Sequence, residues 1–124
     1  MLRFPKSAKI LRSADYRAVY DQSRDHGFRV SNSLFAAFCL PHPGGETRLG
    51  VTTTKALGGA VVRNRIKRRI REIYRLHRPE IVAGWDIVIN PRRPAIEAPF
   101  ADLERAFMKV MERCLSTSKP APAK

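Results

Sequence analysis

A basic amphipathic segment at residues 60–78 constrains the fold of this chain more than any other stretch. Its sequence reads AVVRNRIKRRIREIYRLHR. Apolar side chains recur in it at helical spacing, and at about 100° per residue they fall in one arc. The members of this arc are Ile66, Ile70, Ile73, Tyr74 and His77. The segment is therefore predicted to form a helix that packs one face against a core.

The rest of this helix carries more positive charge than a solvent-exposed face needs. Between Arg63 and Arg78 there are eight basic residues and one acid, Glu72. Like charges at this density repel one another, and pairing four residues apart cannot neutralise them. An ordinary solvated face usually mixes Glu with Lys, whereas a bound polyanion would relieve the repulsion. We favour a polyanion-binding surface over a solvated face.

The composition of the whole chain favours nucleic acid as the polyanion. The 124 residues carry 24 Lys and Arg against 11 Asp and Glu, a formal net charge of +13. Such a field attracts nucleic acid, or less often an anionic membrane, and binding to nucleic acid should weaken with salt. No apolar run approaches the roughly 20 residues of a membrane-spanning helix, and the N-terminus lacks the apolar stretch of a signal peptide. We expect a cytoplasmic protein with no membrane partner.

The residues that most often carry catalysis are scattered. Cys39 and Cys114 lack the spacing of metal ligands and fit buried thiols of a reduced protein better than a disulfide. His26, His42 and His77 lie far apart and outside patterns such as HExxH. The sequence therefore predicts neither a catalytic residue nor a metal site held by this chain.

Helical and strand patterns alternate around the basic helix. The first helix, over residues 13–23, places Tyr16 and Tyr20 on one side, where they either pack or stack on bases. β-Branched and aromatic residues predict strands elsewhere, and a last apolar stripe predicts a C-terminal helix. The strands are expected over 28–40 (two strands or one long bent strand), 48–54 and 85–90, and the last helix over 100–115.

The element order is therefore α-β-β-β-α-β-α. This order predicts an α+β sandwich, in which a four-stranded sheet is packed by helices. The chain is long enough for one domain with a modest core, which we place at residues 1–115. Residues 116–124, STSKPAPAK, are expected to form a disordered tail.

Residues 50–75 resemble the signature of the bacterial ribonuclease P protein family. The core of that signature is Arg-Asn-Arg, here residues 63–65, followed by a basic helix rich in isoleucine. A Gly-x-x-x-x-Lys approach precedes it, met here by Gly50 and Lys55. LRSADYRAVYDQ resembles the first helix of the family, and WDIVINPRRPA resembles its last strand and the loop beyond. The resemblance covers roughly residues 10–113.

Two positions depart from the family pattern. The family usually has a second basic residue after Lys55, where this chain has Ala56, and often has Asn before the alanine, where this chain has Gly59. Both departures bear on side-chain contacts made by the 55–60 loop. They leave the Arg-Asn-Arg core unchanged.

The resemblance implies the protein subunit of a ribonucleoprotein endoribonuclease that removes the 5′ leader from precursor tRNA. Its partners would be the catalytic RNA and the precursor tRNA with its leader, and we expect no obligatory protein partner. Phosphodiester hydrolysis would take place in the RNA subunit, with Mg²⁺ held mainly by the RNA and the substrate. The fold implied includes a left-handed β-α-β crossover around the basic helix, an exception to the usual right-handed rule.

The resemblance also implies two RNA-binding surfaces. The basic helix would face the catalytic RNA, where guanidinium groups bind phosphate oxygens. A cleft between the first helix and the sheet would hold the unpaired leader, whose bases can stack on aromatic rings. The residues implied to bind RNA are Lys55, Arg63, Asn64, Arg65, Lys67, Arg68, Arg69, Arg71 and Arg75, and those implied to line the leader cleft are Tyr16, Tyr20 and Phe38.

Composition alone leaves a second function open. A ribosomal or other structural RNA-binding protein would carry the same charge and a similar helix. A DNA-binding helix-turn-helix is disfavoured because no short helical partner precedes the basic helix. A membrane-surface helix is also basic and amphipathic, but here the apolar stripe is needed to pack the sheet. Stimulation of precursor tRNA cleavage would separate the first function from the second.

Overall fold

A computed structural model describes residues 13–42, 47–77 and 84–118 of the chain. Short 3-10 turns, η2 (Lys55–Leu57) and η4 (Arg93–Ile96), precede the basic helix and follow the last strand. The helices and strands are α1 (Ser13–His26), β1 (Phe28–Ser31), β2 (Phe35–Pro41), β3 (Arg48–Val51), α2 (Ala60–Leu76), β4 (Trp85–Pro91) and α3 (Phe100–Ser118). The predicted order α-β-β-β-α-β-α is confirmed.

Several element ends differ from the predicted ones. The first helix continues to His26, and β3 ends at Val51 because the chain turns into η2. The predicted tail was wrong at its start, since α3 continues to Ser118. Ser and Thr in the last turn are weak helix formers but do not end a helix whose apolar stripe is already packed. The rest of the tail (119–124) and Arg78, the last residue of the predicted basic helix, lie outside the described residues.

The four strands form one sheet in the order β1-β2-β4-β3. The β1–β2 and β2–β4 pairs are antiparallel, whereas β3 and β4 are parallel, with Val51 opposite Ile89. Parallel neighbours cannot be joined by a tight turn, and here α2 makes the connection. The chain therefore contains the predicted β-α-β unit around the basic helix. The left-handed sense of this unit stays an expectation from the family resemblance.

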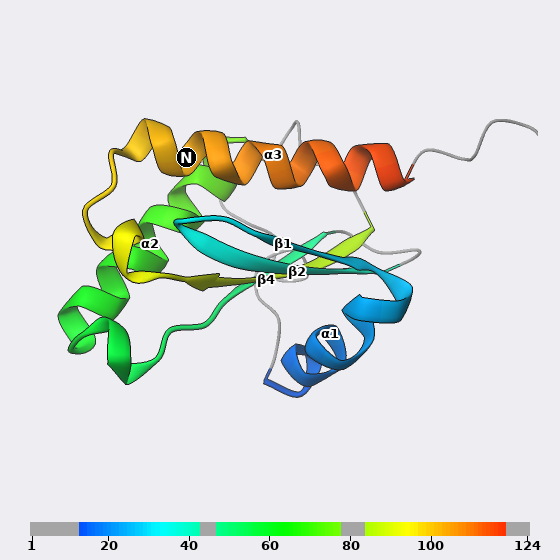
Figure 1. Ribbon diagram of the computed structural model, residues 1–124, viewed down its shortest axis with the longest axis horizontal. Helices are drawn as coiled ribbons and strands as arrows, with labels where there is room; N and C mark the ends of the chain where they lie inside the picture. Colours follow the sequence, from blue (N-terminus) through cyan, green and yellow to red (C-terminus); the bar gives the residue numbers. More distant parts are fainter. Residues whose placement is uncertain (1–12, 43–46, 78–83, 119–124) are drawn as a thin grey trace, which may run out of the picture.

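Each face of the sheet is covered by helix. Figure 1 shows α3 on one side of the strands and α1 on the other. Alternate residues of β4 pack on opposite faces of the sheet. Ile87 and Ile89 belong to the core under α2 and α3, whereas Val88 packs with Val19 of α1. Such burial on both faces explains why β4 is almost continuously apolar.

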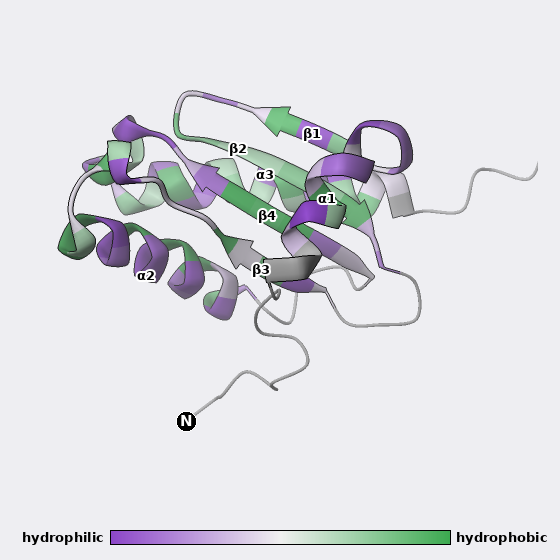
Figure 2. Ribbon diagram, turned by 90° about the horizontal axis from the view of Figure 1, so that it is seen from below, coloured by the Kyte–Doolittle hydropathy of each residue, from purple (hydrophilic) through white to green (hydrophobic). Residues whose placement is uncertain are grey.

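The predicted apolar arc of α2 is confirmed. Ile66, Ile70, Ile73 and Tyr74 are at most 1% exposed, so the side of α2 that faces the sheet is fully packed. His77 is half-buried, and its Nε2 lies 2.5 Å from a carboxylate oxygen of Glu104 in α3. Figure 2 shows the hydrophilic and apolar residues of α2 alternating along the helix as purple and green bands. One side of α2 is thus committed to the core, and the other is left for solvent or a partner.

The two cysteines meet between sheet and helix. Cys39 of β2 and Cys114 of α3 are both buried, and neither forms a disulfide. A hydrogen bond between the thiols, together with burial, raises the pKa of Cys39 far above its usual range. The predicted buried thiols are confirmed as core residues. Among the described helices, none is long and apolar enough to cross a membrane.

Candidate nucleic-acid interface

The Arg-Asn-Arg sequence lies in the first two turns of α2, and two glycines fix where that helix begins. Gly58 adopts a φ of 144°, which an L side chain rarely adopts. Gly59 caps the helix, and its carbonyl accepts a hydrogen bond from the Arg63 N–H at 3.0 Å. Asn64 therefore does not start the helix. It lies one turn inside α2 and is exposed.

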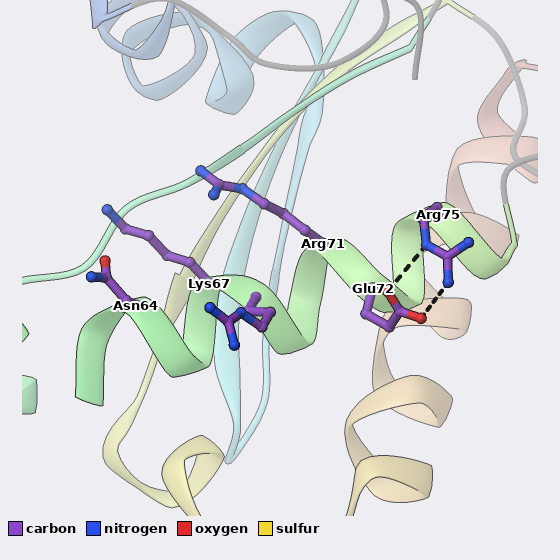
Figure 3. Close-up of a pocket in the computed structure, with 6 residues that line it drawn as sticks. Asn64, Lys67, Arg71, Glu72 and Arg75 are labelled. Carbon is purple, nitrogen blue, oxygen red and sulfur yellow. Dashed lines mark hydrogen bonds and ion pairs between the residues drawn. The ribbon is translucent and has the colours of Figure 1, made fainter. Parts of the chain in front are cut away.

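The exposed side of α2 forms a shallow hollow of about 360 Å³. Among the described residues that line it, the only acid is Glu72. It is paired with Arg75 through two hydrogen bonds, one of them 3.1 Å long, and this pairing lowers the pKa of Glu72. In Figure 3 the side chains of Lys67 and Arg71 extend to the same side of α2 as Asn64. The residues that line the hollow are Asn64, Lys67, Arg68, Arg71, Glu72 and Arg75.

Three of these cations are not neutralised by any carboxylate in the described ranges. Lys67, Arg68 and Arg71 have no carboxylate partner among the described residues. Their mutual repulsion is relieved only by counterions or by a bound polyanion. The hollow can therefore bind closely spaced negative charges, such as the phosphates of a nucleic acid.

Arg69 faces a different way from its neighbour Arg68. Its guanidinium donates hydrogen bonds to the backbone carbonyls of Ala95, at 2.9 Å, and Ala98. These bonds hold the segment after β4 against α2. In this structure Arg69 therefore supports the fold, and its predicted contact with RNA stays a prediction. The sequence held a sign of this role, because at helical spacing Arg69 falls beside the apolar arc and not in the middle of the exposed side.

The remaining predicted basic residues lie around the start of α2. Arg65 and Lys55 are exposed, whereas Arg63 is half-buried and its Nε has no hydrogen-bond partner in the described part of the chain. Sequence reasoning missed Arg93, which donates to the backbone carbonyl of Ala56 at 2.9 Å. Position 56, where the family pattern usually has a basic side chain, thus contributes a backbone carbonyl that accepts a hydrogen bond from Arg93.

The predicted aromatic residues come together on the sheet face that carries α1. The rings of Tyr20 and Phe38 meet edge to face with centroids 4.8 Å apart. Tyr16 lies over Gly50 of β3, where a Cβ would come within 2.3 Å of the Tyr16 ring. All three rings are partly exposed, and we call Tyr16, Tyr20 and Phe38 the aromatic face. Gly50 is therefore needed for the close approach of α1 to the sheet.

Arg29 of β1 borders the aromatic face and was missed by sequence reasoning. Its guanidinium lies 5.1 Å from the centre of the Phe38 ring, and it donates a 2.8 Å hydrogen bond to the Tyr20 carbonyl. A second bond, from Nε to the Ser23 hydroxyl, is 3.1 Å long. Arg29 thus holds α1 in place and adds positive charge beside the rings.

The basic hollow and the aromatic face are neighbours. Burial raises the pKa of Tyr16, and the positive charge of Arg71 partly offsets that rise. Arg71 is therefore close enough to act on Tyr16, although one residue lies on α2 and the other on α1. A strand of nucleic acid could contact the rings and the hollow together.

The arrangement offers groups that can bind a polyanion. The buried acid Asp86 accepts two hydrogen bonds from Arg48, of 2.8 and 2.7 Å, which bridge β3 and β4. Across the described ranges, no three His, Cys, Asp or Glu residues gather in a way that could hold a metal ion. The described side chains offer cations, rings and amides to a partner.

Comparison with known proteins decides the family. The sequence model of the family described as Ribonuclease P matches residues 4–115. The chain belongs to the ribonuclease P protein family. The Ribonuclease P protein component of Roseiflexus sp. (strain RS-1) is 50% identical to it over 95 residues, which cover 76% of this chain and 78% of the relative.

Solved structures of ribonuclease P proteins share the fold. The RNase P protein from Thermotoga maritima superposes with a TM-score of 0.74 at 25% identity, covering 84% of this chain and 96% of that one. The Staphylococcus aureus RNase P protein gives a TM-score of 0.73 at 29% identity, covering 88% and 96%. The predicted family and α+β fold are confirmed.

Membership gives the chain a role in tRNA processing as part of a ribonucleoprotein, with the ribonuclease P RNA as its partner. The contacts of individual residues with RNA stay predictions.

Proposed function

We propose that this chain is the protein subunit of the endoribonuclease that removes the 5′ leader from precursor tRNA. In this proposal α2 binds the catalytic RNA and the aromatic face binds the leader. The observation that carries it is that Lys67, Arg68 and Arg71, which have no carboxylate partner among the described residues, lie on the same domain as the partly exposed rings of the aromatic face. The domain thus offers two chemically different surfaces that suit RNA.

The α2 surface suits a structured RNA. Its sheet side is fully packed, so the helix presents Arg68, Arg71 and Lys67 from a fixed backbone. Guanidinium groups can bind two phosphate oxygens at once, which favours a defined backbone geometry. Each phosphate contact releases counterions, so affinity should fall steeply with salt.

The aromatic face suits an unpaired strand. Every base offers a flat face for stacking, so rings such as Tyr16 and Phe38 bind a leader while reading little of its sequence. Mature tRNA lacks the leader. This surface would therefore favour the precursor over the product.

We assign catalysis to the RNA subunit. Mg²⁺, held mainly by the RNA and the substrate, would assist attack on the phosphodiester. The side chains of this chain bind the two RNAs, orient them and neutralise their phosphates. We place this activity in the cytoplasm, in keeping with the two unoxidised core thiols.

A cleavage assay tests the proposed function. Precursor tRNA and a bacterial ribonuclease P RNA are incubated at low Mg²⁺ and moderate salt, with the protein added or withheld. We expect faster cleavage at the mature 5′ end when the protein is present and no cleavage by the protein alone. Cleavage by the protein alone would reveal an active site on the chain. General RNA binding without stimulation would favour a ribosomal or structural RNA-binding protein.

Replacing Tyr16 with alanine tests the aromatic face. Loss of the ring removes a stacking surface worth about 1–3 kcal/mol per base. Holoenzyme carrying Tyr16→Ala should therefore bind leader-bearing precursor at least about fivefold more weakly, with little change for mature tRNA. Dissociation constants for the two RNAs give the comparison, and Tyr16→Phe, which keeps the ring, is the control. Equal losses for both RNAs would remove the leader-binding role.

A further inference from the structure

Three polar groups converge beside the rings of the aromatic face. The Tyr20 hydroxyl donates a hydrogen bond to Asn90 Oδ1 at 2.8 Å and lies 3.0 Å from Thr52 Oγ1. The Thr52 hydroxyl also donates to Asn90 Oδ1. The three residues come from α1, from the chain just after β3 and from β4, and all are partly exposed. The cluster therefore joins three separate segments at a surface that solvent reaches.

The hydrogen bonds of Asn90 leave one side of its amide unused. A carboxamide oxygen has two lone pairs, and here the two hydroxyl groups occupy both. The Nδ2 group keeps two N–H donors, for which the described part of the chain provides no acceptor. Because the oxygen is held by Tyr20 and Thr52, the direction of these donors is fixed.

This amide lies next to an apolar cluster. Val88, two residues earlier on the same face of β4, packs with Val19 in a small apolar cluster that includes the partly buried ring of Tyr20. An apolar residue at position 90 would extend that cluster. A polar residue held by two hydroxyl groups and left with free donors suggests a partner outside the chain.

We propose that Asn90, oriented by the hydroxyl groups of Tyr20 and Thr52, donates a hydrogen bond to an acceptor of one nucleotide in the bound single strand and sets a base preference there. This inference rests on the proposed function, since the strand has to lie on the aromatic face. A group that can only donate favours an acceptor edge, such as uracil O4 or guanine O6. Where the donor meets the exocyclic position of the base, it disfavours cytosine and adenine, which carry an amino group there. The rings would bind any base, and Asn90 would add selectivity at one position.

Asn90→Asp in the holoenzyme is the decisive variant. Aspartate keeps an oxygen for the two hydroxyl groups but replaces the N–H donors with a second oxygen. We expect affinity for leader-bearing precursor to fall about tenfold, with affinity for mature tRNA changed less than twofold. Tyr20→Phe keeps the stacking ring and removes the orienting hydroxyl, so it should weaken the base preference while retaining most of the affinity. Thermal melts of each variant verify that the domain is folded.

Leaders varied one nucleotide at a time locate the contact. The wild-type holoenzyme should prefer uracil or guanine at one leader position, and Asn90→Asp should abolish that preference. If the wild type shows no base preference but one methylphosphonate linkage removes the effect of Asn90→Asp, the acceptor is a phosphate and the base-reading proposal is overturned. Unchanged affinity in Asn90→Asp overturns it as well. If the wild type binds precursor and mature tRNA equally, the leader-binding function itself fails, a result distinct from the other two.

Discussion

Replacing Ile70 with aspartate is expected to unfold the domain. Ile70 is 1% exposed and lies in the core between α2 and the sheet. A carboxylate there would be buried without a partner, at a cost of several kcal/mol. Since domains of this size are stable by only about 5–15 kcal/mol, most of the folded population should be lost. Circular dichroism during thermal and urea denaturation measures the effect.

Arg68→Asp is the matched control for Ile70→Asp. It introduces the same carboxylate two residues away on the exposed side of α2, where water solvates the charge. We expect Arg68→Asp to melt close to the wild type. A cooperative melt near the wild-type temperature for Ile70→Asp would mean that α2 packs with its other side inward.

The second large effect is expected when Arg68 and Arg69 are each replaced by alanine. Arg68 is exposed and lines the hollow, whereas the Arg69 guanidinium is bonded to the carbonyls of Ala95 and Ala98. Arg68→Ala should weaken assembly with the ribonuclease P RNA and reduce the salt dependence by about one phosphate contact. Arg69→Ala should instead destabilise the fold by about 1–3 kcal/mol, because partly buried carbonyls lose their donor. Filter binding across a salt series and urea denaturation separate the two effects.

The proposed RNA interface makes Arg65→Ala a companion to Arg68→Ala, since Arg65 is also exposed on α2. Unchanged RNA affinity at moderate salt in both variants would count against α2 as the RNA-binding surface. If Arg69→Ala lost RNA affinity at unchanged stability, its guanidinium would have to leave the carbonyls to bind RNA.

Much of the fold could be predicted because the spacing of apolar residues along the chain shows which segments are helices or strands and which side of each is buried. The apolar arc of α2 predicted which residues are buried, and the apolar residues of 85–90 predicted the strand that β4 forms. Element ends were less predictable, because local turn geometry decides them. The extension of α3 to Ser118 has no apolar signal, since its last apolar core residue is Cys114.

The site could be predicted only in part, because helical spacing does not show what a side chain meets from distant segments. Arg68 and Arg69 are adjacent and chemically identical, yet one faces solvent and the other bonds to residues 95–98. The cluster of Tyr20, Thr52 and Asn90 depends on the alignment of β3 with β4, which no local pattern specifies. Arg29 is similar, since its contact with Phe38 depends on the pairing of β1 with β2.

The packing of α2 has a mechanical consequence. Since one side of α2 is packed in the core, and Arg69 ties its middle to the segment after β4, the helix has little freedom to swing. The aromatic face belongs to the same sheet through the contact of Tyr16 with Gly50. In the proposed complex the protein would hold its two RNA-binding surfaces at a fixed separation. The distance between the catalytic RNA and the leader would be fixed by the packing of α1 and α2 on one sheet. A leader shifted by one nucleotide would therefore miss its contacts, because the protein could not move to restore them.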